Sequence, residues 1–396
     1  MKIAVLTETR PGETRVSASP ETVKKLTALG AEIVVQSGAG AHSNFADAAY
    51  SEAGAAIASS AADAARGADL ALKVQRPTVE ELSLLGRGSK LIAILSPHAE
   101  PALLQAYADA GVDAFAMDLM PRITRAQSMD VLSSQSNLAG YKAVIDAAAY
   151  YGRALPMMMT AAGTISAARV FVMGAGVAGL QAIATARRLG AVVSATDVRF
   201  AAKEQVQSLG ATFVTVDEEA MKNAETAGGY AKEMSADFQK RQAEYVGEHL
   251  KKQNIVITTA LIPGRPAPKL ISEEMLRGMA PGSVVVDLAV EAGGNVALSQ
   301  AGEAVDVGGV IILGFNNVAG RLAADASSLY ARNLYNFIAA FWDKEAKTFT
   351  VDWEDAIFKG VGLTRDGALV HPNFGAAQPA PAAEPAPAAS ENGPQG

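Results

Sequence analysis

A chain of 396 residues is too long for a single hydrophobic core, so we expect two domains. Hydrophobic residues make up 49% and charged residues 19%, a balance typical of globular proteins, and a net charge of −7 with no Lys/Arg block argues against nucleic acid as a partner. The absence of cysteine excludes disulfides, a thiolate nucleophile and a zinc–thiolate site, and the four histidines show no metal-ligand spacing.

The first third of the chain has the pattern of an α/β domain. Its N-terminus is charged too early for a signal peptide and is interpreted as a strand at residues 3–6. Ser19 and Pro20 are residue types favoured at the N-cap and first position of a helix. Further strands are expected at 31–35, 69–74, 91–95 and 113–117. Strands that alternate with helices predict a parallel sheet. We expect no transmembrane segment, because the longest charge-free runs are better explained as strand and helix.

A polar segment, residues 120–137, follows these strands. It is neither glycine-rich nor of low complexity, and a helix is expected next, from about Ser134 to Tyr151. A solvated loop is one interpretation. We prefer a position between the two domains, where ligand clefts commonly form.

The second domain is expected to run from about Ser134 to Asn317, and it contains the dinucleotide-binding spacing G-x-G-x-x-G at Gly174, Gly176 and Gly179. A β-branched run precedes it and a helical run follows. Gly174 would make the tight turn, Gly176 would let the backbone approach a pyrophosphate, and Gly179 would let helix and strand pack closely. The helix N-terminus would offer N–H groups to the phosphates. A glycine-rich turn without a ligand is the alternative.

An acidic residue, Asp197, ends the next expected strand, eighteen residues after Gly179. A carboxylate there can accept hydrogen bonds from the adenosine ribose and repels a 2′-phosphate, which favours NAD(H) over NADP(H). Arg199 is the counter-indication, since its charge could meet a 2′-phosphate.

The rest of the chain continues the α/β pattern as far as about residue 317. The polar insertion 217–234 is expected to be a lid or disordered, and the run Met157–Met159 is expected to pack between the domains. We expect His42, His249 and His371 on the surface or in satisfied packing. The remaining elements are expected as helices at 202–209, 236–251 and 323–340, the last returning to the first domain, strands at 212–216, 254–259, 283–288 and 310–313, and a disordered Pro/Ala-rich tail from 375.

Long motifs give the chain a resemblance to a known family. They include Arg-Ala-Gln-Ser-Met-Asp-x-Leu-Ser-Ser-Gln-Ser-Asn-Leu-Ala-Gly-Tyr at 125–141 and Asp-Leu-Ala-Val-Glu-Ala-Gly-Gly-Asn at 287–295. Shorter ones lie at 10–15, 73–77, 157–164, 176–186, 225–231 and 258–264. From Met1 to about Pro372 the sequence resembles the NAD(H)-binding subunit of the proton-translocating NAD(P) transhydrogenases, which are related in fold to alanine dehydrogenase.

The resemblance implies an α/β fold of two Rossmann-like domains with parallel sheets around a central cleft. One domain would comprise 1–133 and 318–374, the other 134–317, and the tail 375–396. It also implies a homodimer that binds NAD(H) and passes a hydride directly to NADP⁺ on a partner subunit. A membrane-spanning subunit would couple this to proton movement, with the present chain peripheral on the cytoplasmic face.

The resemblance further implies a set of site residues. The catalytic candidates are Arg122, Gln127, Asp130 and Ser133. The nicotinamide end of the cofactor would lie at Arg122, Ile123, Thr124, Gln127, Ser128, Met129 and Asp130. The other cofactor contacts would be Gly174, Ala175, Gly176, Val177, Gly179, Asp197, Val198, Arg199, Gly229, Tyr230, Gln242 and Leu261.

Hydride transfer between two nicotinamides requires apposed rings and polar groups that orient them, not a protein nucleophile. We expect Gln127 to bridge ribose or amide groups, Arg122 and Asp130 to form a charge pair, and Tyr230 to sit on a closing loop.

Two other functions remain open. In an alanine-dehydrogenase-like enzyme, Arg15 and Lys73 would hold the substrate. The catalytic histidine of that enzyme would fall near the end of the strand 91–95, and its catalytic aspartate at Glu291. This sequence has Ile-Leu-Ser-Pro there and His98 comes late, so Arg15 and Lys73 are expected to be structural ion-pair residues. The third possibility is an NAD-binding module without enzymatic activity.

Overall fold

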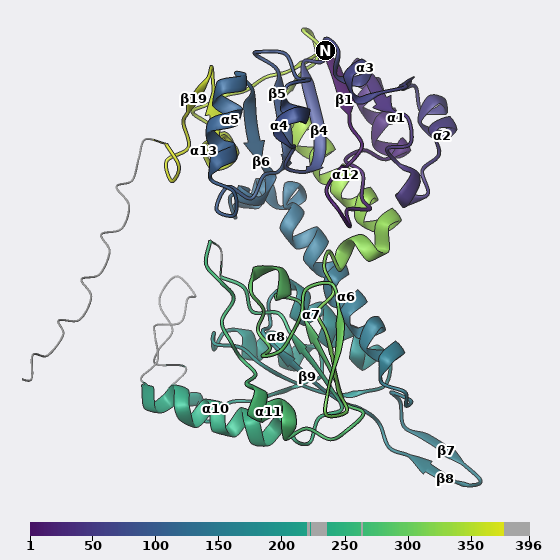
Figure 1. The fold of residues 1–396 in the computed structure, drawn as a ribbon, viewed down its shortest axis with the longest axis vertical. Coiled ribbons are helices and arrows are strands. Elements are labelled where there is room, and N and C mark those ends of the chain that lie inside the picture. Colours follow the sequence, from purple (N-terminus) through teal and green to yellow (C-terminus); the bar gives the residue numbers. More distant parts are fainter. Residues whose placement is uncertain (220–221, 223–235, 263, 376–396) are drawn as a thin grey trace, which may run out of the picture.

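The computed structural model describes residues 1–219, 222, 236–262 and 264–375. Within them the chain forms two α/β bodies, each built around one large sheet (Figure 1). Most of the predicted lid, including Gly229 and Tyr230, and the predicted tail from 376 onward lie outside the described residues. The predicted fold class, α/β with two Rossmann-like parallel sheets, is confirmed.

The first sheet has six parallel strands in the order β3-β2-β1-β4-β5-β6. This is the strand order of a dinucleotide-binding fold, although the segment has no G-x-G-x-x-G. The short strand β3 was not predicted. The strands are β1 (Lys2–Val5), β2 (Glu32–Gln36), β3 (Ala56–Ala58), β4 (Leu70–Gln75), β5 (Lys90–Ile94) and β6 (Asp113–Ala116).

The second sheet has the order β11-β10-β9-β12-β13-β15-β14. Its central strands are β-branched runs buried on both faces, as a parallel sheet covered by helices requires. The edge strand β14 was not predicted and is antiparallel to β15. The strands are β9 (Arg169–Met173), β10 (Val192–Thr196), β11 (Thr212–Phe213), β12 (Ile255–Thr258), β13 (Val284–Asp287), β14 (Ala304–Val307) and β15 (Val310–Leu313).

Helices cover both sheets, and among the described residues none is long and apolar enough to cross a membrane. Ser19 caps the first helix, with Pro20 at its first position, as predicted. The helices beside the first sheet are α1 (Pro20–Ala28), α2 (Asp47–Glu52), α3 (Ala61–Ala65), α4 (Val79–Leu82), α5 (Ala102–Ala110), α12 (Ala323–Ala340) and α13 (Ala356–Val361). Those beside the second are α7 (Val177–Arg188), α8 (Ala202–Ser208), α10 (Ala236–Leu250) and α11 (Glu273–Arg277).

Helix α6 (Val131–Tyr150) runs from the first body into the second (Figure 1). It begins three residues before the predicted start at Ser134, because Asp130 caps it. A Cβ on Gly140 would lie 2.0 Å from the carbonyl oxygen of Ala178, so α6 and α7 approach at backbone distance. At the other end of the chain, α12 packs its buried aromatic residues, Tyr330 and Phe337, into the core of the first sheet.

The prediction for the three methionines is wrong. Met158–Thr160 and Gly163–Ile165 form strands β7 and β8 of a hairpin that projects from the second body (Figure 1). The side chains of Met157 and Met159 are 61% and 78% exposed. The residues therefore face away from both cores.

Short elements complete the description. Two small antiparallel pairs lie near the C-terminus, and single 3₁₀ turns connect the larger elements. They are β16 (Trp342–Asp343) with β17 (Thr348–Phe349), β18 (Thr364–Arg365) with β19 (Ala368–Leu369), and the turns η1 (Ala41–Ser43), η2 (Met117–Leu119), η3 (Thr124–Met129), η4 (Val290–Ala292) and η5 (Ala319–Leu322).

Candidate functional site

The glycine motif forms the predicted strand–turn–helix between β9 and α7. Gly174 has a positive φ of 104°, which side chains disfavour. A Cβ on Gly179 would lie 1.8 Å from the carbonyl oxygen of Gly174, so only glycine lets α7 pack this closely. A Cβ on Gly176 would meet nothing within 4 Å. The loop is thus closely packed at Gly179 and open at Gly176, the residue that caps α7.

Asp197 follows β10 and holds the glycine loop. Its Oδ2 accepts a hydrogen bond from the backbone N–H of Ala175 at 2.7 Å. Arg199 donates from Nε to Oδ1 at 2.9 Å and from Nη2 to Oδ2 at 3.0 Å. The guanidinium also reaches the carbonyl oxygen of Ala175 at 3.3 Å. The carboxylate therefore already has partners, and ribose hydroxyls would have to share it. The charge of Arg199 is paired with that of Asp197.

The polar segment is more ordered than a loop, because residues 124–129 form the 3₁₀ turn η3 and residues from 131 belong to α6. Arg122 and Gln127 are exposed, whereas Ala126 and Met129 are buried in the core of the first body. The remaining residues predicted here are Ile123 before the turn and Thr124 and Ser128 within it, and Thr124 and Ser128 are exposed.

The predicted charge pair between Arg122 and Asp130 is wrong. Among the described residues the two side chains form no ion pair, because the Asp130 carboxylate caps α6. Asp130 accepts hydrogen bonds from the N–H of Ser133 at 2.9 Å and from its Oγ at 2.5 Å. The structure thus brings Asp130 and Ser133 together and leaves Arg122 apart from them.

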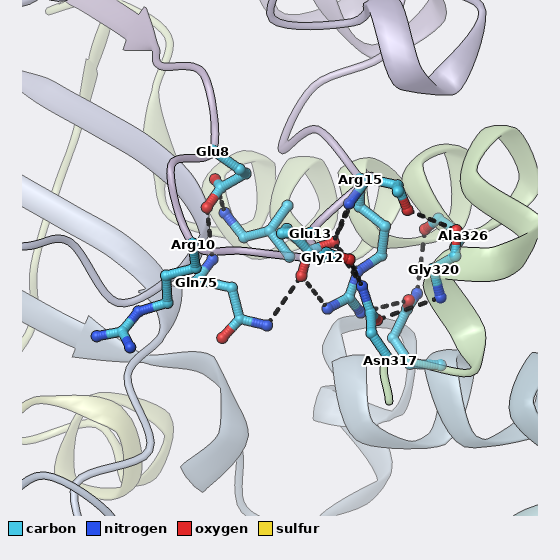
Figure 2. A network of polar contacts seen from close by, with 12 residues as sticks. Glu8, Arg10, Gly12, Glu13, Arg15, Gln75, Asn317, Gly320 and Ala326 are labelled. Atoms are coloured by element: carbon cyan, nitrogen blue, oxygen red, sulfur yellow. Dashed lines mark hydrogen bonds and ion pairs between the residues drawn. The ribbon is translucent and has the colours of Figure 1, made fainter. Parts of the chain in front are cut away.

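The carboxyl ends of the two sheets face each other across the junction of the bodies. Asn317, which follows β15, donates from Nδ2 to the carbonyl oxygen of Gly12 at 3.1 Å and to Oε1 of Glu13 at 3.2 Å (Figure 2). Its own N–H donates to Oε2 of Glu291 at 3.0 Å. On the other side, a Cβ on Gly264 would lie 3.0 Å from the His98 ring. Loops from both bodies therefore meet where α/β folds place ligands.

Arg15 lies at the centre of this junction as one member of a buried ion pair. Its Nη2 is 2.7 Å from Oε2 of Glu13, and its Nη1 donates to Oε1 of Gln135 at 2.8 Å. Gln75 also donates to Glu13, at 2.9 Å (Figure 2). Burial opposes ionisation of Glu13, but the hydrogen bonds and the charge of Arg15, together with the hydrogen bond from Gln75, outweigh it and lower the pKa of Glu13 to about 2.

Lys73 is equally enclosed, with a side chain only 1% exposed. Its Nζ is 2.6 Å from Oε1 of Glu81 and 3.7 Å from Oε2 of Glu8. Burial raises the pKa of Glu8 to about 7, against the opposing charge of Lys73. The predicted interpretation of Arg15 and Lys73 as ion-pair residues is confirmed.

The other predicted cofactor residues are spread along the second body. Val177, Val198 and Leu261 are exposed, and Gln242 accepts a hydrogen bond from the N–H of Val216 at 2.9 Å. His249 and His371 lie in satisfied packing, as predicted, through hydrogen bonds to Ser194 and Gly360. His98 packs against Phe374 and is not a contact of Arg15 or Lys73.

The sequence patterns missed two asparagines that shape the site. Asn317 joins the two bodies, and Asn295 holds the segment that carries Leu261. The Oδ1 of Asn295 accepts from the N–H of Ala260 at 3.0 Å, and its Nδ2 donates to the carbonyl oxygens of Ala260 and Pro268, both at 2.8 Å. Asn295 ends the motif at 287–295, which was its only signal in the sequence.

Comparison with known proteins agrees with this geometry. Residues 4–139 match the model of the N-terminal domain of alanine dehydrogenase/PNT, and residues 143–372 match the C-terminal domain. A protein of Rhodospirillum rubrum that is named as a subunit alpha of NAD(P) transhydrogenase is 58% identical over 94% of this chain and 98% of its own.

Two further comparisons separate the branches of this family. The crystal structure of transhydrogenase from Sinorhizobium meliloti is 56% identical, covers 93% of this chain and 100% of its own, and superposes with a TM-score of 0.85. An alanine dehydrogenase of Halomonas elongata is 30% identical over 94% of this chain and 95% of its own. The chain therefore belongs to the alanine dehydrogenase/PNT family of enzymes, and its similarity is greater to the transhydrogenase alpha subunits than to the alanine dehydrogenases.

Proposed function

We propose that the chain binds NAD(H) at the glycine loop and transfers a hydride to NADP⁺ held by a partner subunit. The observation that carries the proposal is the open backbone at Gly176, where α7 begins beside Asp197. A pyrophosphate fits such a helix N-terminus, since its first N–H groups face the phosphates without an intervening side chain. The 58% identity to a protein named as a transhydrogenase subunit supports the choice of reaction.

The preference for NAD(H) over NADP(H) rests on Asp197. Its carboxylate, 7% exposed, can accept hydrogen bonds from ribose hydroxyls beside those from Arg199, whereas a 2′-phosphate would replace one of these hydroxyl donors. Val198 and Arg199 would lie beside the adenosine ribose, and Ala175 and Val177 beside the pyrophosphate. Gly229, Tyr230, Gln242 and Leu261 remain predicted contacts.

The chemistry that we propose needs orientation rather than a protein acid or base. A nicotinamide cofactor supplies the hydride when bound, and Gln127 of the polar turn η3 would orient the ring and ribose together with Arg122, which lies just before the turn. The hydrogen bonds from Ser133 to Asp130 cap α6 where the turn ends, and they would hold the turn in place beside the cofactor. Ile123, Thr124 and Ser128 would line the cofactor on that side, and Met129, which is buried in the core of the first body, would support the turn from within.

The partners belong to the same proposal. An NADP(H)-binding subunit would supply the acceptor, and a membrane-spanning subunit would couple transfer to proton translocation at the cytoplasmic face of the membrane. We assign the bodies as 1–133 with 318–374 and 134–317. The first boundary falls in the first turn of α6, and the second lies at Asn317, whose positive φ of 44° marks a sharp change of direction.

We also propose that the chain is a homodimer. The hairpin β7–β8 exposes Met157, Met159 and Ile165, a concentration of apolar side chains that marks protein–protein contact surfaces. A second copy that covers this hairpin would bury them. Light scattering should give the mass of two chains, and a mass of one chain at micromolar concentration would contradict the proposal.

The decisive experiment mixes the chain with an NADP⁺-loaded partner subunit and follows hydride transfer from deuterated NADH. We expect the deuterium on NADPH, with Gln127→Asn slower than wild type while its thermal unfolding is unchanged. Absence of transfer by the wild type would refute the proposal, and so would tighter binding of NADPH than of NADH. NADH formation from alanine and NAD⁺ would instead indicate an alanine dehydrogenase.

A further inference from the structure

The turn η3 carries Gln127 on an exposed surface, yet it must hold a fixed position if it is to orient a nicotinamide. Two of its side chains, Ala126 and Met129, anchor it inward. The residues between them, Gln127 and Ser128, are exposed, so packing holds this part of the turn less firmly and another support is needed. That support comes from α12, a helix some two hundred residues later in the chain.

Two asparagines of α12 donate to one carbonyl oxygen of the turn. The Nδ2 of Asn333 lies 2.8 Å from the carbonyl oxygen of Ser128, and the Nδ2 of Asn336 lies 3.0 Å from the same atom. Residues three apart share one face of a helix, so both amides point toward the turn. A carbonyl oxygen has two lone pairs, and the two amides satisfy both.

Asn333 also reaches past the turn to α6. Its Oδ1 accepts a hydrogen bond from the Oγ of Ser134 at 2.7 Å. One buried amide, 8% exposed, therefore bridges Ser128 on one side of Asp130 and Ser134 on the other. Since Asp130 is itself bonded to Ser133, the bridge fixes the corner at which the turn meets the helix.

A third tie holds the start of the turn. Arg125 donates from Nη1 to Oδ2 of Asp355 at 2.7 Å and from Nη2 to Oδ1 at 2.5 Å, a bidentate pair. Asp355 in turn caps α13. Gln127 is thus held between Arg125 and Ser128, and each of these is tied to the C-terminal region of the chain.

We propose that Asn333 and Asn336 are positioning residues for hydride transfer, which hold Gln127 at the reacting ring through the Ser128 carbonyl. The inference rests on the proposed function. Hydride transfer needs the reacting atoms at near-contact distance, and a misplacement of about 1 Å can cost about a hundredfold in rate. Cofactor affinity should depend far less on this turn, because the pyrophosphate and adenosine contacts lie on the second body.

The test compares Asn336→Asp, which keeps the size of the side chain and removes the donor, with Asn336→Gln, which retains a donor. Asn336 is half-buried, so both variants should fold. Arg332→Ala is the matched control, since Arg332 lies on the same helix and pairs with Glu21 on the surface. Each variant is assayed for the single-turnover transfer rate with the NADP⁺-loaded partner, for the dissociation constant of NADH and for thermal unfolding.

We expect Asn336→Asp to slow transfer about tenfold, by analogy with small displacements of reacting groups, while NADH affinity stays within about twofold. Asn336→Gln should recover most of the rate, and Arg332→Ala should match the wild type. If the wild type transfers hydride and Asn336→Asp transfers as fast as Arg332→Ala, the positioning role is overturned. If rate and NADH affinity fall together, the role is one of binding, and the inference is likewise overturned. Failure of the wild type to transfer would refute the proposed function instead.

Discussion

The six parallel strands of the second sheet follow the same spatial order as those of the first, and the carboxyl ends of the two sheets face each other, but the loops at these ends carry different residues. The first body places charged side chains there, Glu8, Glu13 and Arg15 after β1 and Lys73 within β4, all paired within the protein. After β9, the second body places glycines and bare backbone, with space around Gly176.

The difference shows that one topology supports two uses of the same edge. Buried ion pairs are costly to separate, because each charge left alone in the interior loses both water and partner. Backbone N–H groups at a helix start can exchange water for phosphate at little cost. The first edge is therefore suited to fix the junction of the bodies, and the second to exchange a ligand.

The largest expected effect comes from removing the buried ion pair between Arg15 and Glu13 at the carboxyl end of the first sheet. Arg15→Met leaves Glu13 buried without its ionic partner, which should lower the free energy of unfolding by about 4 kcal/mol. The exposed pair Arg332–Glu21 is the control, since Arg332→Ala should cost at most about 1 kcal/mol. Urea unfolding of the three proteins checks this, and equal losses for the two variants would contradict the structural role of Arg15.

A smaller loss of unfolding free energy is expected from a substitution at Gly179, where α7 packs closely against β9. Gly179→Ala places a methyl group 1.8 Å from the Gly174 carbonyl oxygen, so α7 must move away from β9. Overpacking of this kind should cost about 3 kcal/mol of unfolding free energy. A variant as stable as the wild type in urea would mean that helix and strand are less closely coupled than the contact indicates.

A substitution at Gly176, in the open part of the glycine loop, should weaken NADH binding without a loss of stability. Gly176→Ala meets nothing within 4 Å and keeps an ordinary negative φ of −78°, so its unfolding should match the wild type. Its methyl group would occupy the space of the pyrophosphate, and NADH should bind about tenfold more weakly, a loss of about 1.4 kcal/mol. Calorimetric titration measures this, and unchanged affinity would move the phosphates away from this loop.

Much of the fold followed from local patterns. The strands β12 and β13 were predicted because β-branched runs buried on both faces stand out in any sequence. The strand β3 (Ala56–Ala58) and the edge strand β14 lack such runs and were missed. The start of α6 was misplaced because Asp130 was assigned to a ligand, although aspartate is also a favoured N-cap.

The candidate site was less predictable, since its supports come from distant regions of the chain. Asn333 and the Ser128 carbonyl are 205 positions apart, and no local spacing records such a contact. The exposed Met157 and Met159 were expected to pack between the domains, because apolar composition alone does not separate buried positions from exposed ones. The roles of Gly174, Gly176 and Gly179 were easier to predict, because they follow from the spacing of residues that are close together in the sequence.

The smallest expected effect tests whether the charged form of Glu8, at the carboxyl end of the first sheet, stabilises the folded state. Burial raises the pKa of Glu8 from 4.5 to about 7, so the folded state holds a proton that the unfolded state releases above pH 4.5. The stability that this proton gives is complete below pH 4.5 and is lost as the pH rises through 7. Between pH 6 and pH 8 the loss should be about 1 kcal/mol, at 1.36 kcal/mol per pKa unit.

Glu8→Gln removes that titration while it keeps the size of the side chain. Relative to the wild type, the variant should therefore become more stable by about 1 kcal/mol as the pH is raised from 6 to 8. Urea unfolding at both pH values, with Gly176→Ala as a control that leaves this edge intact, measures the change. A difference between Glu8→Gln and the wild type that stays constant would mean that Glu8 is ionised throughout. Its charge, 3.7 Å from the Lys73 ammonium, would then be stabilised by that pair more than burial opposes it.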